Sequence, residues 1–161
     1  MTMQYDVKAA FLSANGTVTP LRNRIKGAFF APTAATNPNA TFVDTSTAIT
    51  GGTYSQTTTT ITVTKTAHGL TVGQRVALEF TSGSGASGGF VVATTPTADT
   101  FTVVTPLTGT NSGNVTIYTG VLLELPVVAT GQSAVVIPGE GILSVNGIYY
   151  VGFSDVTVFY G

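Results

Sequence analysis

The sequence predicts an all-β protein, and three observations support this. Apolar and polar residues alternate with a period of two almost throughout, and no segment shows the 3.6-residue period of a helix. The residue types that dominate, Thr, Val, Ile, Phe and Tyr, fit a pleated, half-buried surface. Gly, Asn, Pro and Ser recur at intervals of about eight to twelve residues, which is typical of sandwiches and barrels. We therefore expect an antiparallel β-sandwich or a barrel-like domain.

The alternation and its interruptions predict the strands in order. In one of them Val76, Leu78 and Phe80 alternate inward, after a turn at residues 68–70. The dipeptides Asn15-Gly16 and Asn146-Gly147 lie between apolar runs and predict two-residue hairpins, which need positive φ at their centres. The eleven predicted strands are Met3–Leu12, Arg24–Ala31, Thr58–Thr66, Gln74–Phe80, Phe90–Thr94, Thr100–Thr105, Val115–Tyr118, Val121–Val127, Ala134–Ile137, Gly147–Gly152 and Val156–Tyr160.

The composition changes partway along the chain. Residues 45–119 hold most of the Thr and Gly, including SGSGASGG at Ser82–Gly89, whereas the flanks hold most of the bulky apolar residues. This predicts a small all-β domain, 45–119, inserted into a discontinuous β-domain formed by 1–44 and 120–161, since insertions are tolerated where the ends of a host loop lie close together. The alternative is one continuous sandwich with a Thr-rich middle. We expect Ser82–Gly89 to be a flexible, exposed hairpin tip.

Charge is scarce. Six basic and seven acidic residues make 8% of the 161 residues, against about 25% in an ordinary domain. A surface with so little charge is poorly protected against association, which favours an assembly subunit over an enzyme. No large field is present to attract nucleic acid, and no apolar run approaches the roughly 20 residues that span a bilayer. The N-terminal residues carry polar and charged side chains where a signal peptide needs an apolar run, and cysteine is absent.

Catalytic, cofactor and metal sites are not predicted. His68 is the only histidine, and we expect it to have a structural role in a turn, because Glu79 and Asp99 do not stand at ligand-like spacing from it. Glycoside hydrolysis would require a defined pair of carboxylates. The acidic residues are scattered and lie in no recognisable motif: Asp6, Asp44, Glu79, Asp99, Glu124, Glu140 and Asp155.

Two motifs resemble parts of bacteriophage particles. TKTAHGLTVGQRVALEF (Thr64–Phe80), followed by GGFVVATTPTADTFTVV (Gly88–Val104), resembles a module that recurs in phage tail and other virion proteins. MQYDVKAAFLSANGTV (Met3–Val18) and VVIPGEGILSVNGIYYVGFSDVTVFYG (Val135–Gly161) are together similar to small virion proteins of short-tailed marine phages of the cyanophage type. The second resemblance implies that the two ends form one compact β-domain.

These resemblances imply a non-enzymatic virion component, assembled in the host cytoplasm. Its small size favours a capsid decoration or cement protein that binds the major capsid protein; the alternative is a tail-associated or tail-fibre protein that contributes to host attachment. No specific nucleic acid, membrane or cofactor is expected, and a homo-oligomer is left open. Arg22, Arg24 and Lys26 alternate on one strand face, and the C-terminal region is rich in aromatic residues of the kind enriched at interfaces. The candidate subunit contacts are Arg22, Arg24, Lys26, Tyr149, Tyr150, Phe159 and Tyr160.

Overall fold

A computed structural model describes residues 7–31, 39–126, 132–152 and 154–161. These residues form antiparallel sheets and one short 3₁₀ helix, η1 (Thr45–Thr47), so the prediction of an all-β fold is confirmed. The sheets do not close into a barrel. No helix among the described residues has the length and apolar character needed to cross a membrane.

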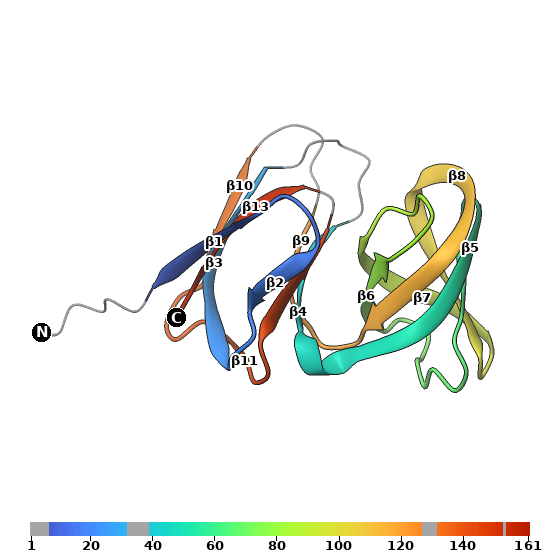
Figure 1. Ribbon diagram of the computed structural model, residues 1–161, viewed down its shortest axis with the longest axis horizontal. Coiled ribbons are helices and arrows are strands. Elements are labelled where there is room, and N and C mark those ends of the chain that lie inside the picture. The colour runs from blue at the N-terminus through green and yellow to red at the C-terminus, as the bar shows by residue number, and fades with distance from the viewer. Residues whose placement is uncertain (1–6, 32–38, 127–131, 153) are drawn as a thin grey trace, which may run out of the picture.

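Two sheets built from the ends of the chain pack on each other as a sandwich, on the left in Figure 1. Their shared core contains fully buried Phe30, Phe42, Ile148 and Tyr150, supplied by both sheets. Sheet A has the order β1 (Lys8–Leu12), β13 (Asp155–Tyr160), β3 (Asn23–Ala31) and β10 (Ser133–Val136), with β11 (Ile142–Ser144) also paired to β3; sheet B has the order β2 (Gly16–Thr19), β12 (Ile148–Val151), β4 (Ala40–Asp44) and β9 (Val121–Leu125).

The Asn-Gly dipeptides connect the two sheets, so the prediction that they form two-residue hairpins is wrong. Residues 13–15 carry the chain from β1 in sheet A to β2 in sheet B, and residues 145–147 carry it from β11 to β12. Gly147 does have a positive φ of 112°, whereas Gly16 does not. The positive φ that the sequence predicts is present at Gly147. A turn signal does not indicate which sheet the next strand joins.

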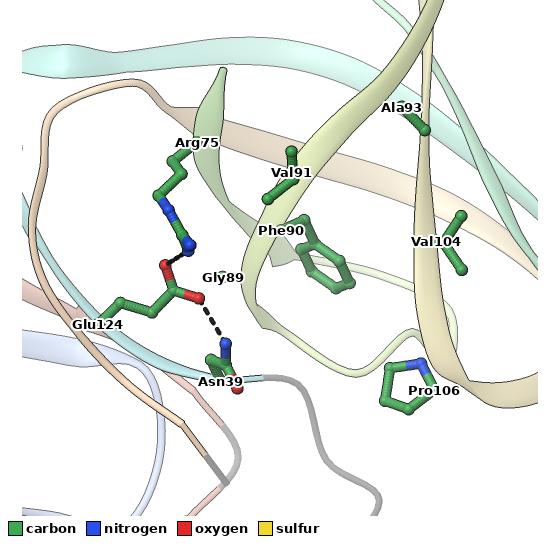
Figure 2. A pocket seen from close by; sticks show the side chains of 9 residues that line it. All are labelled: Asn39, Arg75, Gly89, Phe90, Val91, Ala93, Val104, Pro106 and Glu124. Atoms are coloured by element: carbon green, nitrogen blue, oxygen red, sulfur yellow. Dashed lines mark hydrogen bonds and ion pairs between the residues drawn. The ribbon is translucent and has the colours of Figure 1, made fainter. Parts of the chain in front are cut away.

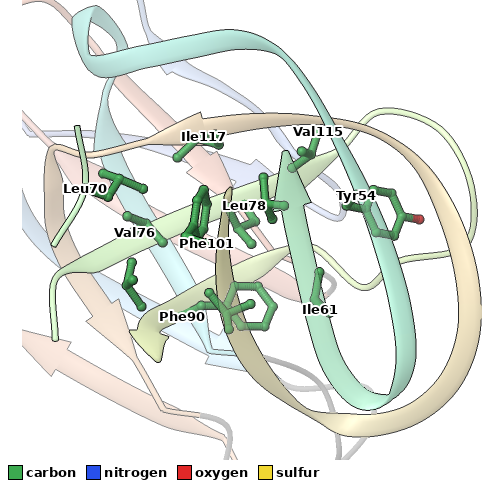
Figure 3. Close-up of a cluster of buried hydrophobic side chains, with 12 residues drawn as sticks. Tyr54, Ile61, Leu70, Val76, Leu78, Phe90, Phe101, Val115 and Ile117 are labelled. Carbon is green, nitrogen blue, oxygen red and sulfur yellow. The ribbon is translucent and has the colours of Figure 1, made fainter. Parts of the chain in front are cut away.

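The third sheet, sheet C, is formed within the Thr-rich middle of the chain and lies on the right in Figure 1. Its strands are β5 (Ala48–Thr64), β6 (Arg75–Phe80), β7 (Gly88–Thr97) and β8 (Thr100–Tyr118). Strand β8 pairs with β5 along most of its length, with β7 near its start and with β6 near its end, so the sheet curves around a core of its own (Figure 3). Hydroxyl pairs join its exposed threonines, Thr94 to Thr102 at 2.7 Å and Thr97 to Thr100 at 2.8 Å.

The chain leaves the sandwich to form sheet C and returns to the sandwich at the same place. Strands β4 and β9 are antiparallel neighbours in sheet B, and the Asp44 N–H donates to the Gly120 carbonyl at 2.9 Å. Immediately beyond, Ala48 is paired with Tyr118 at the start of the β5–β8 ladder. The segment 45–119 therefore occupies the position of a hairpin turn between β4 and β9. Independent folding of this segment as an inserted domain stays a prediction.

Several strands differ from those predicted. The short β2 and β11 and the fully buried β4 were missed, because a strand buried on both faces shows no alternation and a three-residue strand shows almost none. Strands β5 and β8 are much longer than expected and run through glycines and threonines that read as turns. The predicted first strand begins at Lys8 among the described residues; its first residues, 3–6, and Val127 lie outside them.

The prediction of an exposed tip at Ser82–Gly89 holds for residues 82–84 only, because most of the remaining residues of this segment are buried. Tyr54 donates its hydroxyl to the Ser82 carbonyl at 3.2 Å and accepts the Gly85 N–H at 3.0 Å. Residues 85 and 87–89 are buried, and the Ser87 hydroxyl accepts hydrogen bonds from the Phe80 N–H and from the Asn15 side chain of the sandwich. Small side chains here permit close packing.

Candidate contact surfaces

Asp44 organises the point where sheet C joins the sandwich. Its Oδ1 accepts from the Ser46 N–H at 3.0 Å, the Ser46 hydroxyl at 2.7 Å and the Asn146 side chain at 3.3 Å. Its Oδ2 accepts from the Ser144 hydroxyl and the Val145 N–H, both at 2.9 Å, and from the Asn146 N–H at 3.3 Å. Burial disfavours the charged carboxylate, but these hydrogen bonds outweigh burial and hold the pKa of Asp44 well below its usual range. This carboxylate is a structural anchor.

His68 joins the segments Thr64–Phe80 and Gly88–Val104. Its Nδ1 accepts the Leu70 N–H at 3.0 Å, so the neutral ring carries its proton on Nε2, which lies 3.3 Å from the Thr97 carbonyl. The buried ring meets Phe101 edge-on at 5.1 Å, and the Ala67 N–H donates to Asp99. Each of these contacts serves the turn in which His68 lies. No group of three or more His, Cys, Asp or Glu within the described ranges could hold a metal ion.

A carboxylate and two tyrosines connect sheet C to the sandwich. Glu79 of β6 accepts hydrogen bonds from the Tyr118 hydroxyl at 3.0 Å and the Tyr149 hydroxyl at 2.7 Å. The two rings stack with centroids 5.4 Å apart. Burial and the Glu79 charge raise the pKa of both hydroxyls above the usual value for tyrosine. The apolar part of this junction is a separate cluster of Val43, Ala77, Tyr118 and Val151, with Val121 and Tyr149 packed against it.

Replacing Glu79 by glutamine should weaken this junction at neutral pH and make its stability less sensitive to alkaline pH. Raised pKa values favour the neutral phenols, so their contribution to stability is complete below about pH 10 and is lost as the pH rises further. An amide oxygen carries no charge to oppose phenolate formation, so Tyr118 and Tyr149 of Glu79→Gln should ionise at lower pH, with about 1–2 kcal/mol less stability at neutral pH. Absorbance titration of the phenolate band and thermal unfolding measure both effects.

The matched control is Glu140→Gln, because Glu140 is exposed and pairs with Arg24 of sheet A. Burial also raises the pKa of Tyr150 to about 12, and this value should stay unchanged in both variants. Identical phenolate titrations for Glu79→Gln and the native protein would contradict the role given to Glu79.

A second contact between the sheets lines a groove of about 440 Å³, shown in Figure 2. Glu124 of β9 accepts from the Asn39 side chain and pairs with Arg75 of β6, so both carboxylate oxygens are engaged. The Gly89 N–H donates to the Asn39 carbonyl at 2.8 Å, and a Cβ on Gly89 would lie 2.5 Å from the Thr41 hydroxyl. The close approach of β7 to sheet B therefore requires glycine at position 89. The polar side chains that line the groove, Asn39, Arg75 and Glu124, bind one another and so connect sheet B with sheet C.

The three predicted basic contacts differ in their surroundings. Arg24 forms an ion pair with Glu140 at 3.1 Å and donates to the Gly141 carbonyl, and Lys26 donates to the Glu140 carbonyl at 2.9 Å. Both side chains thus hold the loop that follows β10. Arg22 is exposed and precedes β3, so it is not on the strand face shared by the other two. Charge reversal at Arg24 and Lys26 would disturb this loop as well as any contact with a partner.

The four predicted aromatic contacts also differ in their burial and in the residues they pack against. Tyr149 and Tyr150 point to opposite faces of β12, with Tyr150 fully buried in the sandwich core and Tyr149 in the junction described above. Tyr160 is half-buried and packs against the sandwich core, whereas Phe159 is 40% exposed on the outer face of sheet A. Of the four, Phe159 is the most exposed side chain.

The outer face of sheet A carries an apolar surface that sequence reasoning did not single out as a whole. Phe159 there lines a groove of about 470 Å³ with Phe29, Val136 and Lys26. Val136 is 84% exposed and Phe11, on the neighbouring β1, is 67% exposed. The strand pairing places Ala9 beside Phe159, and Phe159 beside Gly27, on this face. Only the three-dimensional order β1–β13–β3–β10 brings these distant residues together.

Comparison with protein-family models and with curated proteins yields no match to this chain.

Proposed function

We propose that this protein is a non-enzymatic structural subunit of a bacteriophage particle and that it decorates the capsid. The observation that carries the proposal is the apolar outer face of sheet A on a molecule with very little charge. Exposed apolar surface of this kind marks interaction sites in soluble proteins. Both virion-like resemblances in the sequence favour the same class of role.

The surroundings of the acidic residues also support a structural role. Asp44, Glu79, Asp99 and Glu124 each accept hydrogen bonds that fix strands, turns or the junction between sheets. General acid catalysis needs a carboxyl group free to exchange protons with a substrate. The proposed partner is the major capsid protein, with the outer face of sheet A toward the particle and sheet C directed away from it.

Quantitative mass spectrometry of purified particles tests the location. A decoration protein should be present in on the order of hundreds of copies per particle, because it follows the icosahedral symmetry of the capsid. A tail component should be present in about 3 to 18 copies, set by the three-, six- or twelvefold symmetry of tails. A count in the lower range would replace the capsid role by the tail role, which the virion-like motif around His68 favours. Absence from purified particles would contradict both.

A further inference from the structure

The edges of the three sheets are protected to different degrees. Free edges offer unpaired N–H and C=O groups to other chains, and proteins protect them with short strands, bulges, prolines or charges. Strand β5 has two register shifts and positive φ at Gly51 and Thr58, and β7 contains Pro96. Strands β2, β10 and β11 have three or four residues each, and β9 carries Glu124, which is paired with Arg75.

Strand β1 is the exception among the described edge strands. It pairs with β13 in an unbroken register from Lys8 opposite Tyr160 to Leu12 opposite Val156, and none of the strands in the described ranges pairs with its other side. It contains no proline, and its one charge, Lys8, is at its start. Lys8, Ala9 and Phe11 are all exposed.

We propose that β1 pairs with β1 of a second copy of this protein, antiparallel and centred on Ala10. In this register Ala9 of each copy lies opposite Phe11 of the other copy. Each exposed phenyl ring therefore covers a methyl group, and the two rings do not face each other. Lys8 lies opposite Leu12, where its aliphatic stem covers an apolar neighbour, and no like charges face each other. The strand is therefore complementary to itself in both size and charge.

The pairing has a geometric consequence for the proposed function. Residues opposite each other in an antiparallel ladder point to the same side of the sheet. The outer faces of both sheets A would therefore lie on one side of the dimer, and two apolar grooves would face one partner surface. The dimer itself does not depend on the capsid role, and it is measured on the isolated protein.

Analytical ultracentrifugation over a wide concentration range tests the pairing. A five-residue edge contact buries less than about 1,200 Å², so the dimer should be weak and should appear as the concentration approaches about 1 mM. The average mass should then rise from 16.4 kDa towards twice this value. A mass that stays at 16.4 kDa throughout would overturn the proposal.

A charge exchange tests the register. One variant carries Ala9→Lys and Phe11→Lys, and the other carries Ala9→Glu and Phe11→Glu. Both positions are exposed, so circular dichroism should show native folds. Each variant alone would place like charges opposite each other and should remain monomeric. An equimolar mixture should form the mixed dimer, because lysine then faces glutamate at both contacts.

Val136→Glu is the matched control, since Val136 is more exposed than Phe11 but lies on β10, at the other edge of sheet A. It should leave dimerisation unchanged. Loss of the dimer in Val136→Glu, or failure of the mixed variants to associate, would show that the copies meet through another surface, and the β1 pairing would be rejected.

Discussion

Asp44→Ala is expected to lower the free energy of unfolding by about 3–5 kcal/mol, which corresponds to a fall in Tm of about 10 °C. The substitution removes the acceptor for the Ser46, Ser144, Val145 and Asn146 donors around a buried carboxylate. Some of these donors would be left unsatisfied, which is more costly than the loss of an exposed hydrogen bond. Thermal unfolding followed by circular dichroism measures the effect.

The same residue should give the protein a recognisable acid sensitivity. A carboxylate whose pKa is lowered by folding stabilises the native state fully above its unfolded pKa of about 3.9, and this contribution is lost as the pH falls further toward the folded value. The native Tm should therefore drop below about pH 4, whereas the Tm of Asp44→Ala should change much less over that range.

Asp99→Ala is the control for both measurements. The exposed side chain of Asp99 accepts a hydrogen bond from the Ala67 N–H. Loss of this side chain should therefore lower the free energy of unfolding by about 1 kcal/mol. If Asp44→Ala were no more destabilised than Asp99→Ala, the Asp44 cluster would not be the anchor that its hydrogen bonds indicate.

Removal of sheet C should leave a folded sandwich. Deleting residues 46–118 and joining the ends through an Asn-Gly turn keeps the Asp44–Gly120 hydrogen bond and the β4–β9 pairing. The sandwich core, which contains Phe30, Phe42 and Tyr150, is built entirely from the remaining strands. The shortened chain should therefore unfold in a cooperative thermal transition, visible by calorimetry.

The deletion uncovers apolar surface, so its design must allow for this. Val43 and Val151 are fully buried against sheet C and would become exposed, at a cost of about 1.5–3 kcal/mol each. Val43→Thr and Val151→Thr in the shortened chain should restore solubility. Lack of a cooperative transition even with these changes would mean that 45–119 is integral to one continuous fold, the alternative that the composition also allows.

The sequence was informative about local structure and less so about how the strands assemble. Period-two alternation correctly predicted β6, β12 and β13, and the opposite orientations of Tyr149 and Tyr150 followed from the same rule. The fully buried β4 escaped notice because both its faces are covered, by the sandwich core and by sheet C. Burial on two sides removes the alternation that such reasoning relies on.

The contact surfaces depended on information that no sequence pattern carries. Phe11, Val136 and Phe159 are far apart in the chain and meet only because sheet A orders its strands as β1–β13–β3–β10. Arg24 and Lys26, which the sequence predicts as contacts with a partner, also hold the loop containing Glu140, and no sequence pattern indicates that second role. Small residues at Ser82–Gly89 suggested mobility, although they allow Tyr54 and the backbone to pack closely.

The hydroxyl pairs on sheet C, Thr94 with Thr102 and Thr97 with Thr100, have a consequence for ionic strength. Dissolved ions screen interactions between charged groups, but a hydrogen bond between two neutral hydroxyls offers them no net charge to act on. A surface held together in this way should keep the same local order in dilute buffer and in concentrated sodium chloride. Proteins that rely on exposed ion pairs lose part of their surface interactions over the same range.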